Sequence, residues 1–174
     1  MKWIIAAAAL CASGAAQADV VSANANGLHV RQEVQIVVPP SNAFAAFGQV
    51  SSWWNPEHSY SGKAANLSLS LNPGGCFCER FTEGGGVEHM RVTYVEPGKR
   101  ILLTGPLGPL LYLATTGVMD VQFERIAGGT KITLDYKAAG FAEGGADKLA
   151  SVVDGVLAEQ MRRYRQFARA RPQR

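Results

Sequence analysis

Residues 146–170 read ADKLASVVDGVLAEQMRRYRQFARA and set the architecture of this chain. Apolar side chains recur in this stretch at steps of three and four residues, among them Val153, Leu157, Met161 and Tyr164. This spacing is typical of one face of an α-helix. We therefore expect one long amphipathic helix, whose apolar stripe must be buried against a large surface supplied by the rest of the chain.

The preceding sequence predicts that this surface is a β-sheet. Residues 28–38 (LHVRQEVQIVV) alternate apolar and polar side chains, the pattern of a strand with one wet face. Two short helices are expected next, around residues 41–47 and 51–56. Further strands, each bounded by Gly, Pro or Asn turns, are expected at 66–71, 76–82, 87–95, 101–104, 117–126 and 130–139. The predicted fold class is α+β: a curved antiparallel sheet wrapped around a long C-terminal helix, with two short helices after the first strand.

The N-terminus reads MKWIIAAAALCASGAAQA over residues 1–18 and has the marks of a cleaved signal peptide. Lys2 precedes an apolar run that is shorter than the roughly 20 residues of a membrane anchor. A small-x-small site predicts cleavage after Ala18 and leaves a single domain, residues 19–174. We expect a periplasmic or secreted protein without a stable membrane anchor. Cleavage removes one charged residue, Lys2, and lowers the formal net charge from +3 to +2. A charge this close to balance does not indicate nucleic-acid binding.

Four stretches carry a resemblance to a known superfamily: VVPPSNAFAAFGQVSSWW (37–54), NLSLSLNPGGCFCE (66–79), VEHMRVTYVEPGKRILLTGPLGPL (87–110) and GGTKITLDYKAAG (128–140). With the terminal helix, they resemble the START-like (SRPBCC) helix-grip superfamily. That superfamily includes the birch-pollen allergen, polyketide cyclases and dehydratases, and the C-terminal domain of heat-shock-protein-90 ATPase activators. The resemblance implies a deep, mostly apolar cavity between the sheet and the terminal helix.

Glu79 and His89 are the candidate catalytic residues. They stand on strands joined by a glycine turn, and two registers place His89 opposite either Glu79 or Arg80. A slip of one residue reverses the facing of a side chain, so both arrangements stay open. If the two side chains share the cavity face, they form an acid/base pair suited to proton transfer. The alternative is a structural pair in which His89 satisfies a buried carboxylate.

Several other residues are expected in the cavity wall. Trp53 and Trp54 diverge by about 100° on a helix, so one can fill the core while the other lines the cavity. The apolar stretch LGPLLYL (107–113) is expected to bend over the cavity as a lid or a bulged strand. The predicted cavity residues are Trp53, Trp54, Phe77, Glu79, His89, Tyr112, Tyr136, Val153 and Leu157.

The segment GGCFCERF (74–81) places two cysteines on one face of a strand. Residues two apart in a regular strand have Cα atoms about 6.6 Å apart, near the upper end of the disulfide range. We expect Cys76 and Cys78 to be two free, packed thiols, with a strained, readily reduced disulfide as the alternative. Phe77 and Glu79 occupy the opposite face, which we expect to line the cavity.

The sequence contains no phosphate loop, HExxH, CxxC or G-x-S-x-G motif. We therefore expect no cofactor and no metal site. The favoured function is an exported binding or carrier domain for a small hydrophobic molecule such as a lipid, a polyketide or an aromatic, working as a monomer or weak homodimer. One alternative is a cyclase, dehydratase or isomerase that uses Glu79 and His89. Another is a protein-interaction module, although export separates the protein from a cytosolic chaperone.

Overall fold

The computed structural model describes residues 17–170 of the chain. The predicted signal peptide, residues 1–18, lies outside this part except for Gln17 and Ala18, which begin strand β1 (Gln17–Asn24). No helix within residues 17–170 has both the length and the apolar character needed to span a membrane.

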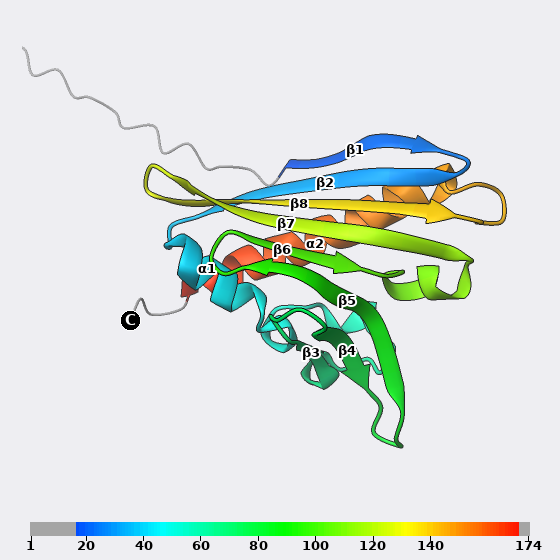
Figure 1. The fold of residues 1–174 in the computed structure, drawn as a ribbon, viewed down its shortest axis with the longest axis horizontal. Coiled ribbons are helices and arrows are strands. Elements are labelled where there is room, and N and C mark those ends of the chain that lie inside the picture. The colour runs from blue at the N-terminus through cyan, green and yellow to red at the C-terminus, as the bar shows by residue number, and fades with distance from the viewer. Residues whose placement is uncertain (1–16, 171–174) are drawn as a thin grey trace, which may run out of the picture.

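One antiparallel sheet of eight strands forms the body of the protein, in the order β1-β2-β8-β7-β6-β5-β4-β3 (Figure 1). Its remaining strands are β2 (Gly27–Ile36), β3 (Leu67–Leu69), β4 (Cys76–Arg80), β5 (Gly86–Glu96), β6 (Arg100–Thr104), β7 (Thr115–Ile126) and β8 (Gly129–Gly140). The helix α2 (Asp147–Ala170) lies across one face of this curved sheet (Figure 1). The predicted α+β, helix-grip class is confirmed.

The short helices differ in number and place from the prediction. Helix α1 (Pro40–Phe47) and the 3-10 turns η1 (Val50–Ser52), η2 (Pro56–His58) and η3 (Ala64–Asn66) follow β2, which is the second strand. Strand β1 was not predicted, because residues 19–24 are all exposed at the sheet edge and therefore show no apolar alternation. A fourth 3-10 turn, η4 (Gly108–Tyr112), occupies the stretch predicted to be a lid or a bulged strand.

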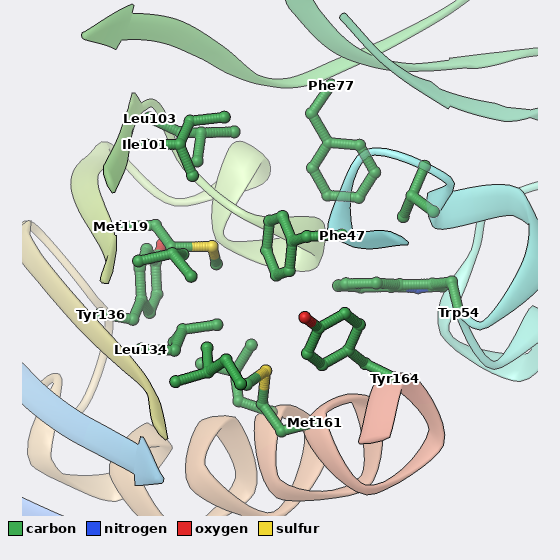
Figure 2. Packing of buried hydrophobic residues seen from close by; sticks show 14 of the residues in the cluster. Phe47, Trp54, Phe77, Ile101, Leu103, Met119, Leu134, Tyr136, Met161 and Tyr164 are labelled. Carbon is green, nitrogen blue, oxygen red and sulfur yellow. The ribbon is translucent and has the colours of Figure 1, made fainter. Parts of the chain in front are cut away.

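The core lies between the sheet, α1 and α2, and its centre is aromatic (Figure 2). The Tyr164 ring on α2 packs edge-on against Phe47 at 5.5 Å and against Trp53 at 5.4 Å between ring centroids. Its hydroxyl donates to the carbonyl oxygen of Ala43 at 2.8 Å. Offset and edge-to-face aromatic contacts add to the apolar area that they bury, so this cluster fixes α1 against α2.

A β-bulge interrupts the ladder between β4 and β5. Phe77 pairs with Met90, whereas the next residue, Cys78, pairs with Glu88, so His89 is an extra residue on β5. Alternation along β5 breaks at the same point, since His89 and Met90 are both buried. The bulge therefore turns two consecutive side chains toward the interior.

Both registers predicted for this strand pair are wrong. Glu79 pairs with Val87 and Arg80 with Gly86, so His89 stands directly opposite neither Glu79 nor Arg80. The predicted registers centred the turn between the strands on Gly84 or just beyond it, whereas the pairing of Arg80 with Gly86 centres it on Glu83. The bulge then adds one residue of β5 beyond the pair of Cys78 with Glu88.

Candidate functional site

A cavity of about 530 Å³ opens between α2, η4 and the loop that follows Trp54. Most of its lining is apolar. Helix α2 contributes Val153, Val156 and Leu157, and the segment around η4 contributes Leu107, Leu110 and Leu113. The volume lies within the range of about 300–1,000 Å³ that is usual for small-molecule sites.

Five of the predicted cavity residues line this space: Trp54, His89, Tyr136, Val153 and Leu157. Phe77 and Glu79 face the interior but lie behind the wall, where both are almost fully buried. The wall itself is formed in front of them by the His89 ring and the Tyr60 ring.

Trp53 does not line this cavity. Its indole Nε1 donates to the carbonyl oxygens of Ala46 and Phe47 at 3.2 Å each, and its ring packs in the aromatic core. The Trp54 ring contacts that of Trp53 at 5.6 Å between centroids, packs against Phe77 and donates to the carbonyl oxygen of His58 at 2.8 Å. The two adjacent indoles thus divide between core and cavity, as their angular separation allows.

Tyr112 is also not a cavity residue, because 75% of its surface is exposed. Leu107, which precedes the tight turn η4, and Leu110 within it are buried, which leaves Tyr112 on the outer side. The segment nevertheless covers the cavity, since Leu107, Gly108 and Leu110 all line it.

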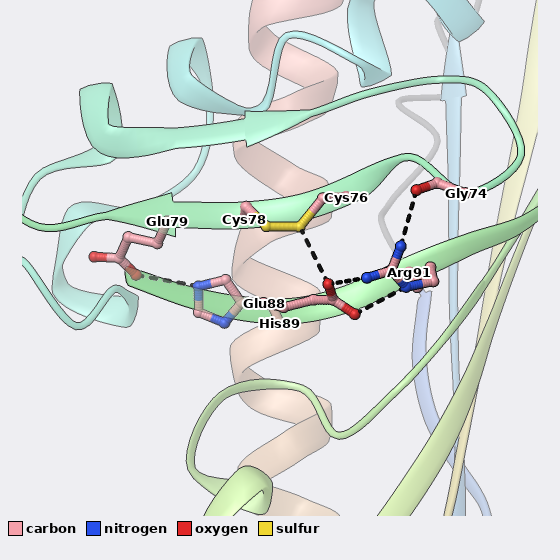
Figure 3. Close-up of a disulfide and its surroundings, with 7 residues drawn as sticks. All are labelled: Gly74, Cys76, Cys78, Glu79, Glu88, His89 and Arg91. Atoms are coloured by element: carbon pink, nitrogen blue, oxygen red, sulfur yellow. Dashed lines mark hydrogen bonds and ion pairs between the residues drawn. A yellow bond between two sulfur atoms is a disulfide. The ribbon is translucent and has the colours of Figure 1, made fainter. Parts of the chain in front are cut away.

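Glu79 and His89 form a buried pair on the inner face of β4 and β5 (Figure 3). Oε2 of Glu79 lies 3.1 Å from Nε2 of His89. The Glu79 carboxylate also accepts hydrogen bonds from the backbone N–H of Tyr60 at 3.0 Å and of Ser61 at 2.5 Å. A carboxylate that is 1% exposed is thus satisfied by three donors, which is what its burial requires.

The pair is charged on the carboxylate and neutral on the imidazole at neutral pH. Burial by itself raises the pKa of Glu79, but hydrogen bonds from Ser61, Tyr60 and His89 outweigh it, so the pKa lies below its ordinary value. Burial lowers the pKa of His89 in spite of the opposing effect of Glu79. Since Glu79 is an acceptor, Nε2 of His89 carries the proton and Nδ1 is an unprotonated acceptor.

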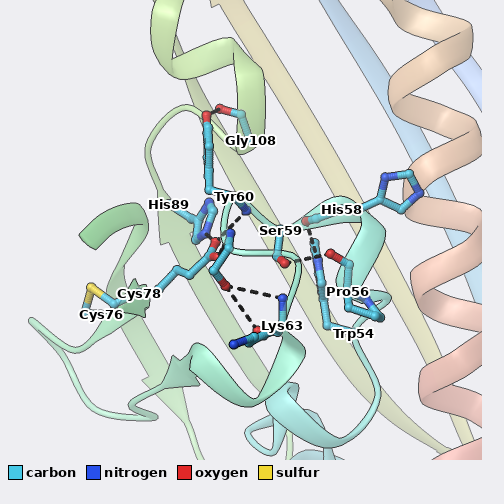
Figure 4. Close-up of polar contacts among 12 residues, drawn as sticks. Trp54, Pro56, His58, Ser59, Tyr60, Lys63, Cys76, Cys78, His89 and Gly108 are labelled. Atoms are coloured by element: carbon cyan, nitrogen blue, oxygen red, sulfur yellow. Dashed lines mark hydrogen bonds and ion pairs between the residues drawn. A yellow bond between two sulfur atoms is a disulfide. The ribbon is translucent and has the colours of Figure 1, made fainter. Parts of the chain in front are cut away.

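Two aromatic rings contact the His89 ring. Tyr60 stacks on it at 5.7 Å with an interplanar angle of 26°, and Phe77 lies 5.0 Å from it with a tilt of 37°. The Tyr60 hydroxyl donates to the carbonyl oxygen of Gly108 at 2.9 Å, which ties the loop after η2 to η4 (Figure 4). Tyr60 lines the cavity although it is 37% exposed.

Tyr136 contributes the floor of the cavity on β8. It is fully buried, and its hydroxyl accepts from the backbone N–H of Leu107 at 3.1 Å. Burial raises the pKa of Tyr136 to about 12, so the phenol stays protonated. The hydroxyl therefore anchors the start of the η4 segment.

The opposite face of β4 carries the two cysteines, which form a disulfide in place of the free thiols we expected (Figure 3). Their Cα atoms lie 5.3 Å apart, closer than in a regular strand. Within residues 17–170, Cys76, Cys78 and Glu88 are the one group of three metal-ligating side chains whose ligand atoms lie within 4.8 Å of one another. Two of those atoms are the bonded sulfurs.

No family model matches the chain, and no curated protein matches its sequence. Solved structures do match it. An uncharacterised protein from Rhizobium leguminosarum aligns with a TM-score of 0.58 at 18% identity, over 88% of this chain and 97% of that one. CalU16 from Micromonospora echinospora aligns with a TM-score of 0.56 at 11% identity, over 91% and 87%.

A third match is DynU16, a protein of the dynemicin biosynthetic locus. It aligns with a TM-score of 0.57 at 17% identity, over 82% of this chain and 47% of DynU16. At such identities the likeness establishes the fold: an antiparallel sheet with a long C-terminal helix, of the helix-grip type.

Proposed function

We propose that the protein binds a small, mostly apolar molecule in the cavity beneath η4 and α2. The observation that carries the proposal is an apolar cavity of about 530 Å³ with the buried imidazole of His89 in its wall. Burying the apolar part of such a molecule supplies about 25 cal/mol per Å² of surface removed from water. One polar contact then fixes its orientation.

The polar contact follows from the tautomer of His89. Nε2 is taken by Glu79, and among the described residues none hydrogen-bonds to Nδ1. A neutral Nδ1 accepts a hydrogen bond and cannot donate one. The favoured ligand therefore carries an uncharged donor, such as a phenol or enol hydroxyl, at the end that reaches His89.

Blocking the cavity tests this proposal. Val153 lines the cavity on α2, whereas Ser151 on the same helix is exposed and lies outside it. We expect native mass spectrometry of protein taken from its own host to show a bound small molecule in the wild type and in Ser151→Trp. Val153→Trp should lose it while keeping the same circular dichroism. A wild-type protein that carries no adduct and binds no aromatic probe would contradict the proposal.

A second candidate function is proton transfer on the bound molecule. The observation in its favour is the buried Glu79–His89 pair, in which a carboxylate orients an imidazole whose other nitrogen is free to take a proton. Cyclases, dehydratases and isomerases all use such a step. Exchange of the α-protons of 2-tetralone in D₂O, followed by NMR, provides the test. We expect faster exchange with the wild type than with His89→Gln; equal rates would remove this candidate.

Export is part of the same proposal and rests on the sequence of residues 1–18. The expected mature protein begins at Asp19 and is found outside the cytoplasm. Intact mass of the protein from the periplasmic fraction measures this directly. A cytoplasmic protein that retains residues 1–18 would contradict export.

A further inference from the structure

The Cys76–Cys78 disulfide sits opposite the bulge that places His89. The two Cα atoms are 5.3 Å apart, whereas a regular strand separates residues i and i+2 by about 6.6 Å. Strand β4 is therefore contracted across Phe77, the residue at which the β4–β5 register shifts. The contraction on β4 and the extra residue, His89, on β5 face each other across the ladder.

This local geometry determines which side chains face inward. Because of the bulge, His89 and Met90 are both buried, and His89 reaches Glu79 diagonally. Glu79 is the residue that follows Cys78, so a change in the path of β4 at the disulfide moves the carboxylate directly. The 3.1 Å contact between Glu79 and His89 therefore depends on both strands keeping their present course.

Thiols in solution can reach the disulfide. A surface hollow of about 620 Å³ on the outer side of the sheet is lined by both cysteines together with Ser68, Ser70 and Glu88. Sγ of Cys76 lies 3.9 Å from Oε2 of Glu88, and Arg91 Nε donates to Oε1 of Glu88 at 3.1 Å. Glu79 also lines the hollow, but its side chain is 0% exposed and pairs with His89 on the other face of β4.

We propose that Cys76 and Cys78 form a thiol-exchange site whose opening releases the contraction of β4 and loosens the Glu79–His89 pair. The site takes a small thiol of the glutathione type. Its thiolate attacks one Sγ, the S–S bond breaks, and the electron pair leaves on the other Sγ, which takes up a proton. A second thiol attacks the mixed disulfide and frees the second cysteine, so two external thiols are oxidised to a disulfide while the protein disulfide is reduced.

The inference deepens the proposed function, because the pair is the polar end of the proposed binding cavity. It rests, however, on the geometry of the strands and not on a bound ligand. Its test therefore measures His89 in the ligand-free protein. The thiol-exchange inference and the proposed ligand binding can then be confirmed or refuted independently of each other.

The experiment compares the full chain before and after treatment with reduced glutathione, with a chelator present so that freed thiols capture no metal. Alkylation and mass spectrometry report the state of Cys76 and Cys78. NMR titration reports each histidine. We expect glutathione to reduce the folded protein and the midpoint of His89 to move up toward that of an ordinary histidine, since burial is what holds it down.

Two results would overturn the inference: a folded protein whose disulfide glutathione does not open, or a reduced protein whose His89 titrates as in the oxidised one. The double variant Cys76→Ala/Cys78→Ala provides the second arm. We expect its His89 to titrate as in the reduced wild type, with no response to glutathione; a midpoint equal to that of the oxidised wild type would also overturn the inference. If the double variant does not fold, the reduced wild type carries the test alone.

Discussion

Oε2 of Glu79 lies 3.1 Å from Nε2 of His89, although the two residues are not paired across strands β4 and β5. The contact is diagonal: His89 lies two residues beyond Val87, the partner of Glu79, at the bulge that also turns Met90 inward. The result is a carboxylate and an imidazole that are both buried, with the imidazole in the cavity wall.

Glu79→Gln removes the charge but keeps the shape of the side chain. The negative charge raises the pKa of His89 against the effect of burial, so its loss should lower that pKa further. The free energy of unfolding should fall by about 1.5–3 kcal/mol, the usual contribution of hydrogen bonds to a charged group. NMR titration and urea unfolding measure the two effects. Glu88→Gln on the exposed outer face is the control, and an unchanged His89 midpoint in Glu79→Gln would refute the coupling.

Acidification should destabilise the protein in two steps. Both pKa values are lower in the folded state than the ordinary 6.5 of His89 and 4.5 of Glu79, so the unfolded chain binds more protons. The contribution of His89 is complete above pH 6.5 and is lost as the pH falls from there toward its folded pKa; that of Glu79 is lost only below 4.5.

Urea unfolding at pH 7, 6 and 5 measures the first step. One group limits the slope to about 1.4 kcal/mol per pH unit. We expect His89→Gln to flatten the decline between pH 7 and 5. Parallel declines in the wild type and in His89→Gln would show that His89 is not the group responsible.

Tyr60→Phe removes the hydrogen bond from the Tyr60 hydroxyl to Gly108, which joins the loop after η2 to η4. It keeps the ring that stacks on His89. One neutral hydrogen bond contributes about 1 kcal/mol, so a bound probe should dissociate roughly fivefold faster. Stopped-flow fluorescence of 1-naphthol release measures the rate. Tyr94→Phe, an exposed tyrosine on β5, should release the probe at the wild-type rate. Equal release rates for Tyr60→Phe and the wild type would mean that the hydrogen bond between Tyr60 and Gly108 does not keep the cavity closed.

Two glycines should respond to alanine in opposite directions. A Cβ at Gly155 on α2 meets nothing within 4 Å, so Gly155→Ala should raise the free energy of unfolding by about 1 kcal/mol through helix propensity. A Cβ at Gly117 falls 2.7 Å from Oη of Tyr136, so Gly117→Ala should displace that ring and destabilise the protein. Urea unfolding of both variants checks the signs, and two changes of the same sign would contradict this reading of the packing.

The sequence predicts the fold well because the fold depends on periodicity. Leu157 and Met161 repeat at helical spacing along α2, and β2 alternates along its length, so both elements and the faces that they bury can be read directly. Strand β1 has no such signal because it is exposed. The register between β4 and β5 has none either, since a bulge of one residue leaves no mark in the sequence around His89.

The site is harder to predict because half of it comes from a loop. The N–H groups of Tyr60 and Ser61 reach Glu79 only after the chain has folded back over β4. A buried carboxylate always requires donors, so Glu79 on the inner face implies that some loop must supply them, but the sequence does not say which. Tyr112 illustrates the opposite error: an apolar stretch suggested an inward tyrosine, and the tight turn η4 placed it outside.

The most direct test of the proposed binding site compares two probes that differ by one hydroxyl. We expect isothermal titration calorimetry to show that 2-naphthol binds the wild type about tenfold more tightly than naphthalene, because its hydroxyl donates to His89; tenfold corresponds to about 1.4 kcal/mol. The preference should disappear in His89→Phe, which keeps a ring between Tyr60 and Phe77. Failure of both probes to bind the wild type, or an undiminished preference for 2-naphthol in His89→Phe, would contradict the account.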